Sequence, residues 1–286
     1  MMLRYIKKHN SKRIFVMKKI FCFIALLSLY VLGQMLIIPP IFAEDRERPV
    51  AGRYYLSPEG GTSFTIGGEF VNQMKSSASL NLAGISITST LSNDDFDFDD
   101  VFKTPKVFGL SLGYGVTDST ELFSRIQSTL ASAETFDIAQ FNVTGTFDGV
   151  TVSAGETLGA RFDDYKEFGF TIGARHYINR FGKLSPFISI EGGVSHVEEI
   201  ELDIFTSAGN IKNVSFYSDS WTPKISTGVG ISYEINKDAS FTVESGVGYQ
   251  AQLNADDADW GYLYKDVNNA GERWSVPLTF GFKIRW

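Results

Sequence analysis

The chain has 286 residues, a formal net charge of −7 and a single cysteine. An acidic protein is a poor partner for nucleic acid, because phosphate backbones attract basic surfaces. One cysteine cannot form a disulfide within the chain or a multi-thiolate metal site. We therefore expect no nucleic-acid partner and no cofactor.

The first predicted element is a secretory leader over residues 1–43. Two lysines, Lys18 and Lys19, precede the apolar run 20–32, and the small residue Ala43 precedes a charged stretch. This order is typical of a cleaved signal peptide. The alternative is a membrane-spanning helix, since the run approaches the ~20 residues that cross a bilayer. Interrupting prolines favour cleavage after Ala43, and residues 1–16 are a candidate upstream extension.

Removal of this leader makes the protein more acidic. Residues 1–43 contain Cys22 and seven of the 26 basic residues, and they contain no acidic residue. The remaining 19 basic and 33 acidic residues give residues 44–286 a formal net charge of −14. Such a surface favours divalent cations or basic partners.

Eight later segments, each of about ten residues or more, alternate between apolar and small or polar side chains. They span 53–64, 106–116, 121–130, 168–178, 185–195, 223–235, 241–250 and 273–286. Alternation gives each strand one apolar face and one face rich in Gly, Ser and Thr. The apolar face would form the core of a soluble sandwich, or face lipid in a transmembrane barrel.

Three features favour the barrel. The segments are long enough for tilted strands to cross a bilayer, whereas soluble strands average about five to six residues. The polar faces carry small side chains, as a narrow lumen requires. Aromatic residues also lie at both segment ends, as in the belts of membrane proteins. They are Tyr54, Tyr114, Tyr233, Phe241 and Trp286 at one end, and Phe168, Trp221, Tyr249 and Trp274 at the other. We predict an all-β, eight-stranded antiparallel transmembrane β-barrel over 44–286.

The predicted connections alternate in length. Short turns are expected at 117–120, 179–183 and 236–239, and long loops at about 65–105, 131–166, 199–221 and 251–272. Short periplasmic turns and long extracellular loops are typical of such barrels.

Parts of the long loops are expected to be structured. Asp148-Gly149 and residues 207–210 indicate hairpins that extend strands three to six beyond the membrane. Segment 79–91 is a candidate ninth strand, but it has no evident partner in its own loop. An even strand number therefore favours eight.

The final strand carries a motif that resembles a known signal. Its alternate apolar residues are Phe280, Phe282, Ile284 and Trp286. A final strand ending in an aromatic residue looks like the signal read by the barrel assembly machinery, although Trp286 replaces the more usual Phe. Residues 50–286 are similar in layout to the eight-stranded barrels of OmpA, OmpX and opacity-protein type. This resemblance implies a bacterial outer-membrane location, with lipid and lipopolysaccharide as neighbours.

Charged residues with inward parity are the first candidate site. They are Glu59, Arg125, Arg175, Glu191, Glu244 and Lys283. Their distances from the strand ends place three acids and three bases at similar depth in a lumen only wide enough for side chains. We interpret them as a paired network that plugs the barrel, since unpaired buried charges are costly. A gated ion path is the alternative.

Acidic loop clusters are the second candidate site. They are Asp94, Asp95, Asp97, Asp99 and Asp100, and then Asp256, Asp257 and Asp259. Oxygen-rich loops can bind Ca²⁺ or Mg²⁺, but the spacing is not that of an EF-hand, so solvated loops are the simpler interpretation. Beside the second cluster, Trp260, Tyr262 and Tyr264 could contact a partner or extend the aromatic belt.

No catalytic constellation emerges from the sequence. His176 has outward parity near a short turn, and His196 and Ser195 are neighbours that must point to opposite faces of one strand. We therefore predict that the chain is not an enzyme; a lipid-modifying activity is the weakest alternative. The predicted role is structural, adhesive or antigenic, through extracellular loops that contact host or extracellular ligands. A small porin-like pore is the main alternative.

Overall fold

The computed structural model describes residues 50–82, 85–147, 150–178, 180–206, 209–255 and 267–286. Eight antiparallel strands form a closed barrel in the order β1-β16-β15-β14-β11-β10-β7-β6. They are β1 (Tyr54–Gly67), β6 (Lys106–Thr117), β7 (Thr120–Ala131), β10 (Tyr165–Tyr177), β11 (Leu184–Val197), β14 (Ser220–Glu234), β15 (Ala239–Gln250) and β16 (Arg273–Arg285). The first strand pairs with the last, which closes the barrel and confirms the predicted fold class.

The barrel is apolar outside and packed with polar and small side chains inside. Phe280, Phe282 and Ile284 on β16 and Trp286 directly after it are 40–61% exposed, whereas Lys283 on β16 is fully buried. The same alternation recurs on the other strands, so the outer surface is a continuous apolar band. Such a band would be strongly unfavourable in water and is the surface that a barrel presents to lipid. Both predicted aromatic belts form, as in the ring contacts Tyr54–Tyr114 and Tyr249–Trp274, each 4.8 Å between centroids.

The short turns lie where the sequence predicted them. Only Asp118 and Ser119 separate β6 from β7, and four residues, 235–238, separate β14 from β15. The first strand, β1, begins on this same side and the last strand, β16, ends there, so that the Tyr54 amide donates to the carbonyl oxygen of Trp286. The long connections therefore all emerge from the opposite end of the barrel.

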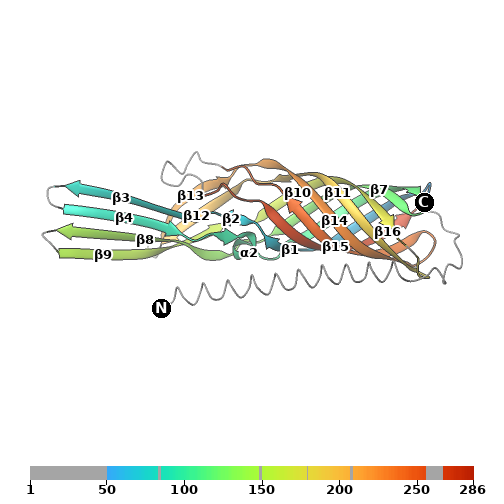
Figure 1. Cartoon of the computed structure of the whole chain (residues 1–286), viewed down its shortest axis with the longest axis horizontal. Helices are drawn as coiled ribbons and strands as arrows, with labels where there is room; N and C mark the ends of the chain where they lie inside the picture. The colour runs from blue at the N-terminus through green and yellow to red at the C-terminus, as the bar shows by residue number, and fades with distance from the viewer. Residues whose placement is uncertain (1–49, 83–84, 148–149, 179, 207–208, 256–266) are drawn as a thin grey trace.

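Hairpins at that opposite end continue beyond the barrel as a second sheet (Figure 1). Its strand order is β13-β12-β9-β8-β4-β3. The strands are β3 (Met74–Leu82), β4 (Ile85–Asn93), β8 (Thr135–Phe147), β9 (Val150–Phe162), β12 (Ile200–Thr206) and β13 (Gly209–Tyr217). The two predicted hairpins are present, although residues 148–149 and 207–208 themselves lie outside the described residues.

The expectation for segment 79–91 was wrong. It is not one unpartnered strand, because it contributes to both β3 and β4, which pair with each other from Met74↔Asn93 to Leu82↔Ile85. Residues 83–84, which connect these strands in the sequence, lie outside the described residues; their sequence, Ala-Gly, is not the Asp-Gly pair that indicated the other hairpin. In addition, β4 pairs with β8 from a different loop, a long-range contact that local patterns do not reveal.

The remaining part of the first long loop folds over the barrel mouth. It contains the short ribbon of β2 (Glu69–Val71) with β5 (Phe96–Asp97) and the single turn α2 (Phe98–Val101). These elements pack against β9, β12 and β13 to form a compact apolar cluster, here called the mouth core. Its members include Phe70, Val71, Phe98, Val101, Phe102, Phe162, Ile200, Leu202, Phe216 and Tyr217.

Two further findings concern the predicted segments. Within the described residues, no helix is both long and apolar enough to cross a membrane. The predicted leader, 1–43, lies outside the described residues, so its cleavage after Ala43 stays a prediction.

Candidate functional site

The barrel interior concentrates charge because strand parity turns these side chains inward. On β7, Glu121, Phe123, Arg125 and Thr129 are buried, while the intervening Leu122 and Ile126 are exposed to the outside. A carboxylate or guanidinium in such a narrow lumen loses most of its hydration, so it must find an opposite charge. The structure arranges these charges in three clusters along the barrel.

The central cluster consists of Arg125 and Arg175 with Glu59, Glu191 and Glu244. Arg125 lies 2.8 Å from carboxylate oxygens of both Glu59 and Glu191 and 3.4 Å from Glu244. Arg175 lies 2.9 Å from Glu244. Hydroxyl groups complete the shell: Ser111 donates to Glu59, Thr171 and Ser226 to Glu191, and Ser189 to Glu244. Five of the six predicted lumen residues therefore meet in one ion-paired network.

Lys283 belongs to a different group, which corrects the prediction that all six residues lie at similar depth. The lower cluster, near the short turns, surrounds Glu121, whose carboxylate lies 2.5 Å from Lys283 and 3.6 Å from Arg285. Tyr177 donates to the same carboxylate, and the Lys283 ammonium lies 4.0 Å from the ring centroid of Tyr55. Counting from strand ends failed because barrel strands tilt and are staggered.

Arg175 connects the lower and central clusters. Its guanidinium lies 3.7 Å from Glu121 and also contacts Glu244. The rings of Phe123 and Phe187 flank it, with centroids 5.3 and 4.5 Å from its central carbon. Arg175 thus holds two layers of carboxylates together across the lumen.

A third group, the upper cluster, was missed by sequence reasoning. Glu167 on β10 lies 2.7 Å from Arg273 and 3.1 Å from Lys224, and it accepts hydrogen bonds from Ser195 and Tyr165. Gln250 accepts from Arg273 at 2.7 Å. Glu167 lies near the start of β10, one residue before the predicted segment 168–178. Glu121 of the lower cluster is the first residue of the predicted segment 121–130. Extending the inward parity by one residue would have found Glu167.

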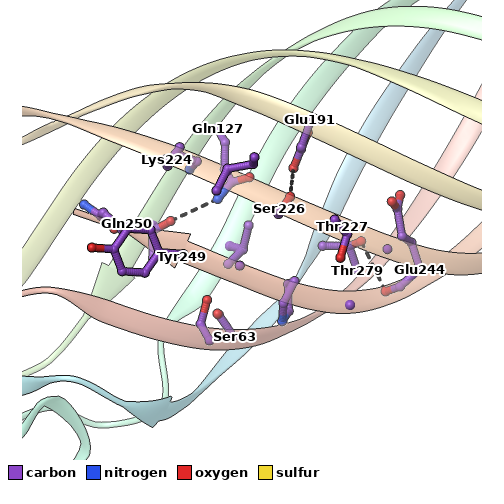
Figure 2. Close-up of a pocket in the computed structure, with 18 of the residues that line it drawn as sticks. Ser63, Gln127, Glu191, Lys224, Ser226, Thr227, Glu244, Tyr249, Gln250 and Thr279 are labelled. Atoms are coloured by element: carbon purple, nitrogen blue, oxygen red, sulfur yellow. Dashed lines mark hydrogen bonds between the residues drawn. The ribbon is translucent and has the colours of Figure 1, made fainter. Parts of the chain in front are cut away.

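A small cavity separates the central and upper clusters (Figure 2). Its volume is about 70 Å³, and its lining includes Arg125, Glu191, Lys224, Gln250 and Arg273. This is room for a few water molecules, since each needs roughly 10–15 Å³ of such space. Charged groups of the central and upper clusters line this cavity, so it is a polar space within the lumen.

The mouth core closes the outer end of the lumen. Phe98 from α2 and Tyr165 from β10 flank the Arg273 guanidinium, with ring centroids 4.9 and 5.0 Å from its central carbon. Phe98 also contacts Phe102 and Tyr165. The uppermost lumen charge is therefore covered directly by apolar side chains of the folded loop.

The first acidic cluster is more ordered than a solvated loop. Asp94 and Asp95 are exposed, whereas Asp97, Asp99 and Asp100 lie in or beside β5 and α2. The Asp97 amide donates to Asp100 Oδ2 at 3.1 Å. No group of three or more His, Cys, Asp or Glu side chains within the described ranges is placed to hold a metal ion. The second cluster, Asp256, Asp257 and Asp259, and its aromatic neighbours Trp260, Tyr262 and Tyr264 lie outside the described residues.

Partial burial and the surrounding acids raise the pKa of Asp97 from 3.8 to about 6, with burial the largest cause. The folded protein therefore holds this proton more tightly than the unfolded chain. We expect the free energy of unfolding of the mouth core to fall as the pH rises from about 4 to 6 and then to level off. Hydrogen exchange of the β5–α2 amides at pH 4.5 and 7 measures this change. Asp97→Asn should flatten the profile, and an unchanged profile in that variant would contradict the assignment.

The histidines lie where their parity placed them. His176 is exposed on the outer surface, within 3.0 Å of Thr120 Oγ1. His196 Nε2 lies 3.1 Å from Asp219, and its ring packs beside Trp221 in the outer belt. Ser195 points the opposite way, into the lumen, where it donates to Glu167. His196 and Ser195 therefore do not form a dyad.

No protein-family model and no curated protein matches the sequence. Solved structures do match. Neisserial surface protein A is 11% identical with a TM-score of 0.39, and 82% of this chain aligns with 99% of it. Ail, the attachment invasion locus protein of Yersinia pestis, is 11% identical (TM-score 0.37; 82% and 99%), and the Escherichia coli outer-membrane protease OmpT is 12% identical (TM-score 0.38; 82% and 97%). The closed strand order and apolar exterior are themselves those of a small eight-stranded outer-membrane barrel.

Proposed function

We propose that this chain is a surface protein of the bacterial outer membrane with a structural or adhesive role. The observation that carries this proposal is that ordered β-structure extends far beyond the membrane-spanning barrel, along the long axis of the molecule. Beyond the barrel, six strands form a sheet of their own that projects away from the lipid-facing band (Figure 1). A projecting, ordered sheet presents a recognition surface, whereas a protein that only had to span the membrane would not need it.

The interior supports a plug in preference to a pore. Three ion-paired clusters occupy successive depths of the lumen, and each acid in them contacts at least one base. Opening a path would require breaking several desolvated pairs at once, at a cost of several kcal/mol for each uncompensated charge. We therefore assign the charged lumen a structural role and place recognition on the extracellular sheet.

The test shortens the projecting sheet without touching the barrel. Residues 77–90 are replaced by Asn-Gly, so that Ser76 and Leu91, which are paired in the native hairpin, close a tight turn. We expect the variant to insert into lipid vesicles as a folded barrel but to lose adhesion of these vesicles to cells or extracellular matrix. Full adhesion by a folded variant would contradict the proposal.

The matched measurement is single-channel conductance of the intact protein in a planar bilayer. We expect a silent bilayer, because the central, lower and upper clusters block the lumen in series. Discrete openings with the outer hairpins intact would instead support the pore, and a lumen substitution that altered them would identify the gate.

A further inference from the structure

The projecting part of the second sheet has one apolar face. In β3, β4, β8 and β9, residues directly opposite in the register share a face, as in the rows Leu80–Ile87–Gly145–Val152 and Ala78–Ser89–Val143–Ala154. Strand alternation therefore brings aliphatic and aromatic side chains together. We call this surface the tip face; its larger members are Leu80, Ile85, Ile87, Phe141, Val143 and Val152.

The tip face continues the surface that packs against the mouth core. Nearer the membrane, Met74 on β3 and Leu158 on β9 have the same parity and pack against that core. Farther from the membrane, none of the described residues packs on the tip face. Leu80 is 53% exposed and Val152 67% exposed. The same strands thus pass from a covered apolar face to an open one.

The opposite face of these strands is built from hydroxyl groups. The hydroxyl oxygens of Ser79 and Thr88 lie 3.1 Å apart, and those of Thr144 and Ser153 lie 3.2 Å apart. Thr146 and Thr151 form a further pair at 3.1 Å. This face is suited to water. A sheet with one wetted and one apolar face is stable when the apolar face is packed against another layer.

Charge and orientation indicate what that layer is. Residues 74–93 and 139–156 contain only Lys75, Asp148 and Glu156 as charged residues, in a chain that is otherwise strongly acidic. Glu156 pairs with Phe141, so it lies at the membrane-proximal edge of the tip face. Two copies can therefore meet on the rest of this face with far less repulsion than their other surfaces would cause. Lipid is excluded as the covering layer, because the strands extend along the barrel axis, away from the apolar band (Figure 1).

The size of the face also fits a second copy. With strands about 4.8 Å apart and a rise of about 3.4 Å per residue, the roughly seven residues of each of the four strands that lie beyond the mouth core present roughly 450 Å². Two such faces stack about 10 Å apart and together bury about 900 Å², which is in the range of weak, transient interfaces. We propose that the tip face is a homotypic contact, through which the sheets of two copies stack face to face in a two-fold arrangement.

This inference deepens the proposed adhesive role by naming the partner as a second copy of the chain. Its geometry suits copies in facing membranes, since each sheet projects outward along its barrel axis. A second copy in the same membrane would use the same face, and the two cases are separable. Clustering of vesicles reports contacts between membranes, and energy transfer within single vesicles reports contacts in one membrane.

The first experiment compares two neighbouring residues of β4 that point to opposite faces. Ile87→Lys places a charge in the tip face, whereas Thr88→Lys places it in the hydroxyl face, where Thr88 meets Ser79. In proteoliposomes we expect wild type and Thr88→Lys to cluster and Ile87→Lys to lose at least tenfold of the clustering or of the energy transfer. Equal behaviour of the two variants, or no self-association of wild type, would overturn the proposal.

A second measurement does not depend on the stability of the lysine variants. The only native cysteine, Cys22, lies in the predicted leader, so a single cysteine can be introduced into residues 44–286 without competition. A thiol cross-linker of about 10 Å, the spacing of stacked sheets, should join Leu80→Cys into a covalent dimer and leave Ser79→Cys monomeric. Failure of Leu80→Cys to cross-link, with adhesion to cells or matrix intact, would remove the homotypic contact but leave the proposed surface role.

Discussion

Replacing Arg125 with alanine is expected to lower the free energy of unfolding by about 3–5 kcal/mol, the usual cost of breaking a buried ion pair from one side. Arg125 is 6% exposed and contacts Glu59, Glu191 and Glu244. Its removal leaves the first two carboxylates without a basic partner, while Glu244 retains Arg175. Glu59 and Glu191 would then repel each other in a space that offers them only hydroxyl groups and a small cavity. Urea unfolding in lipid vesicles, followed by tryptophan fluorescence, measures the loss.

The matched control is Gln127→Ala, two residues along the same strand and also inward-facing. Gln127 is uncharged and donates one hydrogen bond, to Thr129 at 3.3 Å, so we expect a loss of about 1 kcal/mol. Combining Arg125→Ala with Glu191→Gln removes one of the stranded charges and should recover part of the stability. If Arg125→Ala unfolded at the same urea concentration as the wild type, the central cluster would not be a structural plug.

The barrel itself was predictable because its information is local. Alternation with a period of two is enforced by the environment on each strand separately, since one slip would place Lys283 in lipid and Phe282 in the lumen. The turn lengths were predictable for the same reason. Inward parity likewise identified Arg125, Arg175 and the three acids of the central cluster.

The depth of each charge was not predictable from parity alone. Lys283 lies in the lower cluster because strand stagger, a property of the closed barrel, sets which residues of different strands share a level. The mouth core and the β4–β8 pairing were missed for a related reason. They join residues from separate loops, so no window of sequence contains both partners. The sequence therefore predicted which face of a strand each residue occupies. It did not predict the depth of each charge in the lumen or the pairing of strands from separate loops, because these depend on the folded barrel as a whole.

Phe70→Ala is expected to destabilise the mouth core by about 3–5 kcal/mol, the range for removing a large aromatic side chain from a packed interior. Phe70 is 1% exposed, and its ring contacts those of Phe98, Phe102, Phe162 and Tyr217 at centroid distances of 5.0–5.8 Å. These partners lie in α2, β9 and β13 or directly beside them. The cavity that Phe70→Ala creates in the mouth core would therefore loosen the packing of every element that covers the lumen.

The effect should be confined to the outer half of the molecule, because the barrel is held by its own closed hydrogen-bond network and ion-paired clusters. Hydrogen exchange is expected to accelerate in β2, β5, α2 and β12 of Phe70→Ala while β1 and β16 stay protected. Phe141→Ala, a phenylalanine of the projecting sheet that is 38% exposed, is the control and should cost far less. If exchange accelerated equally in β1 and β16, the mouth and the barrel would unfold as one unit. The mouth core would then hold the barrel together as well as cover it.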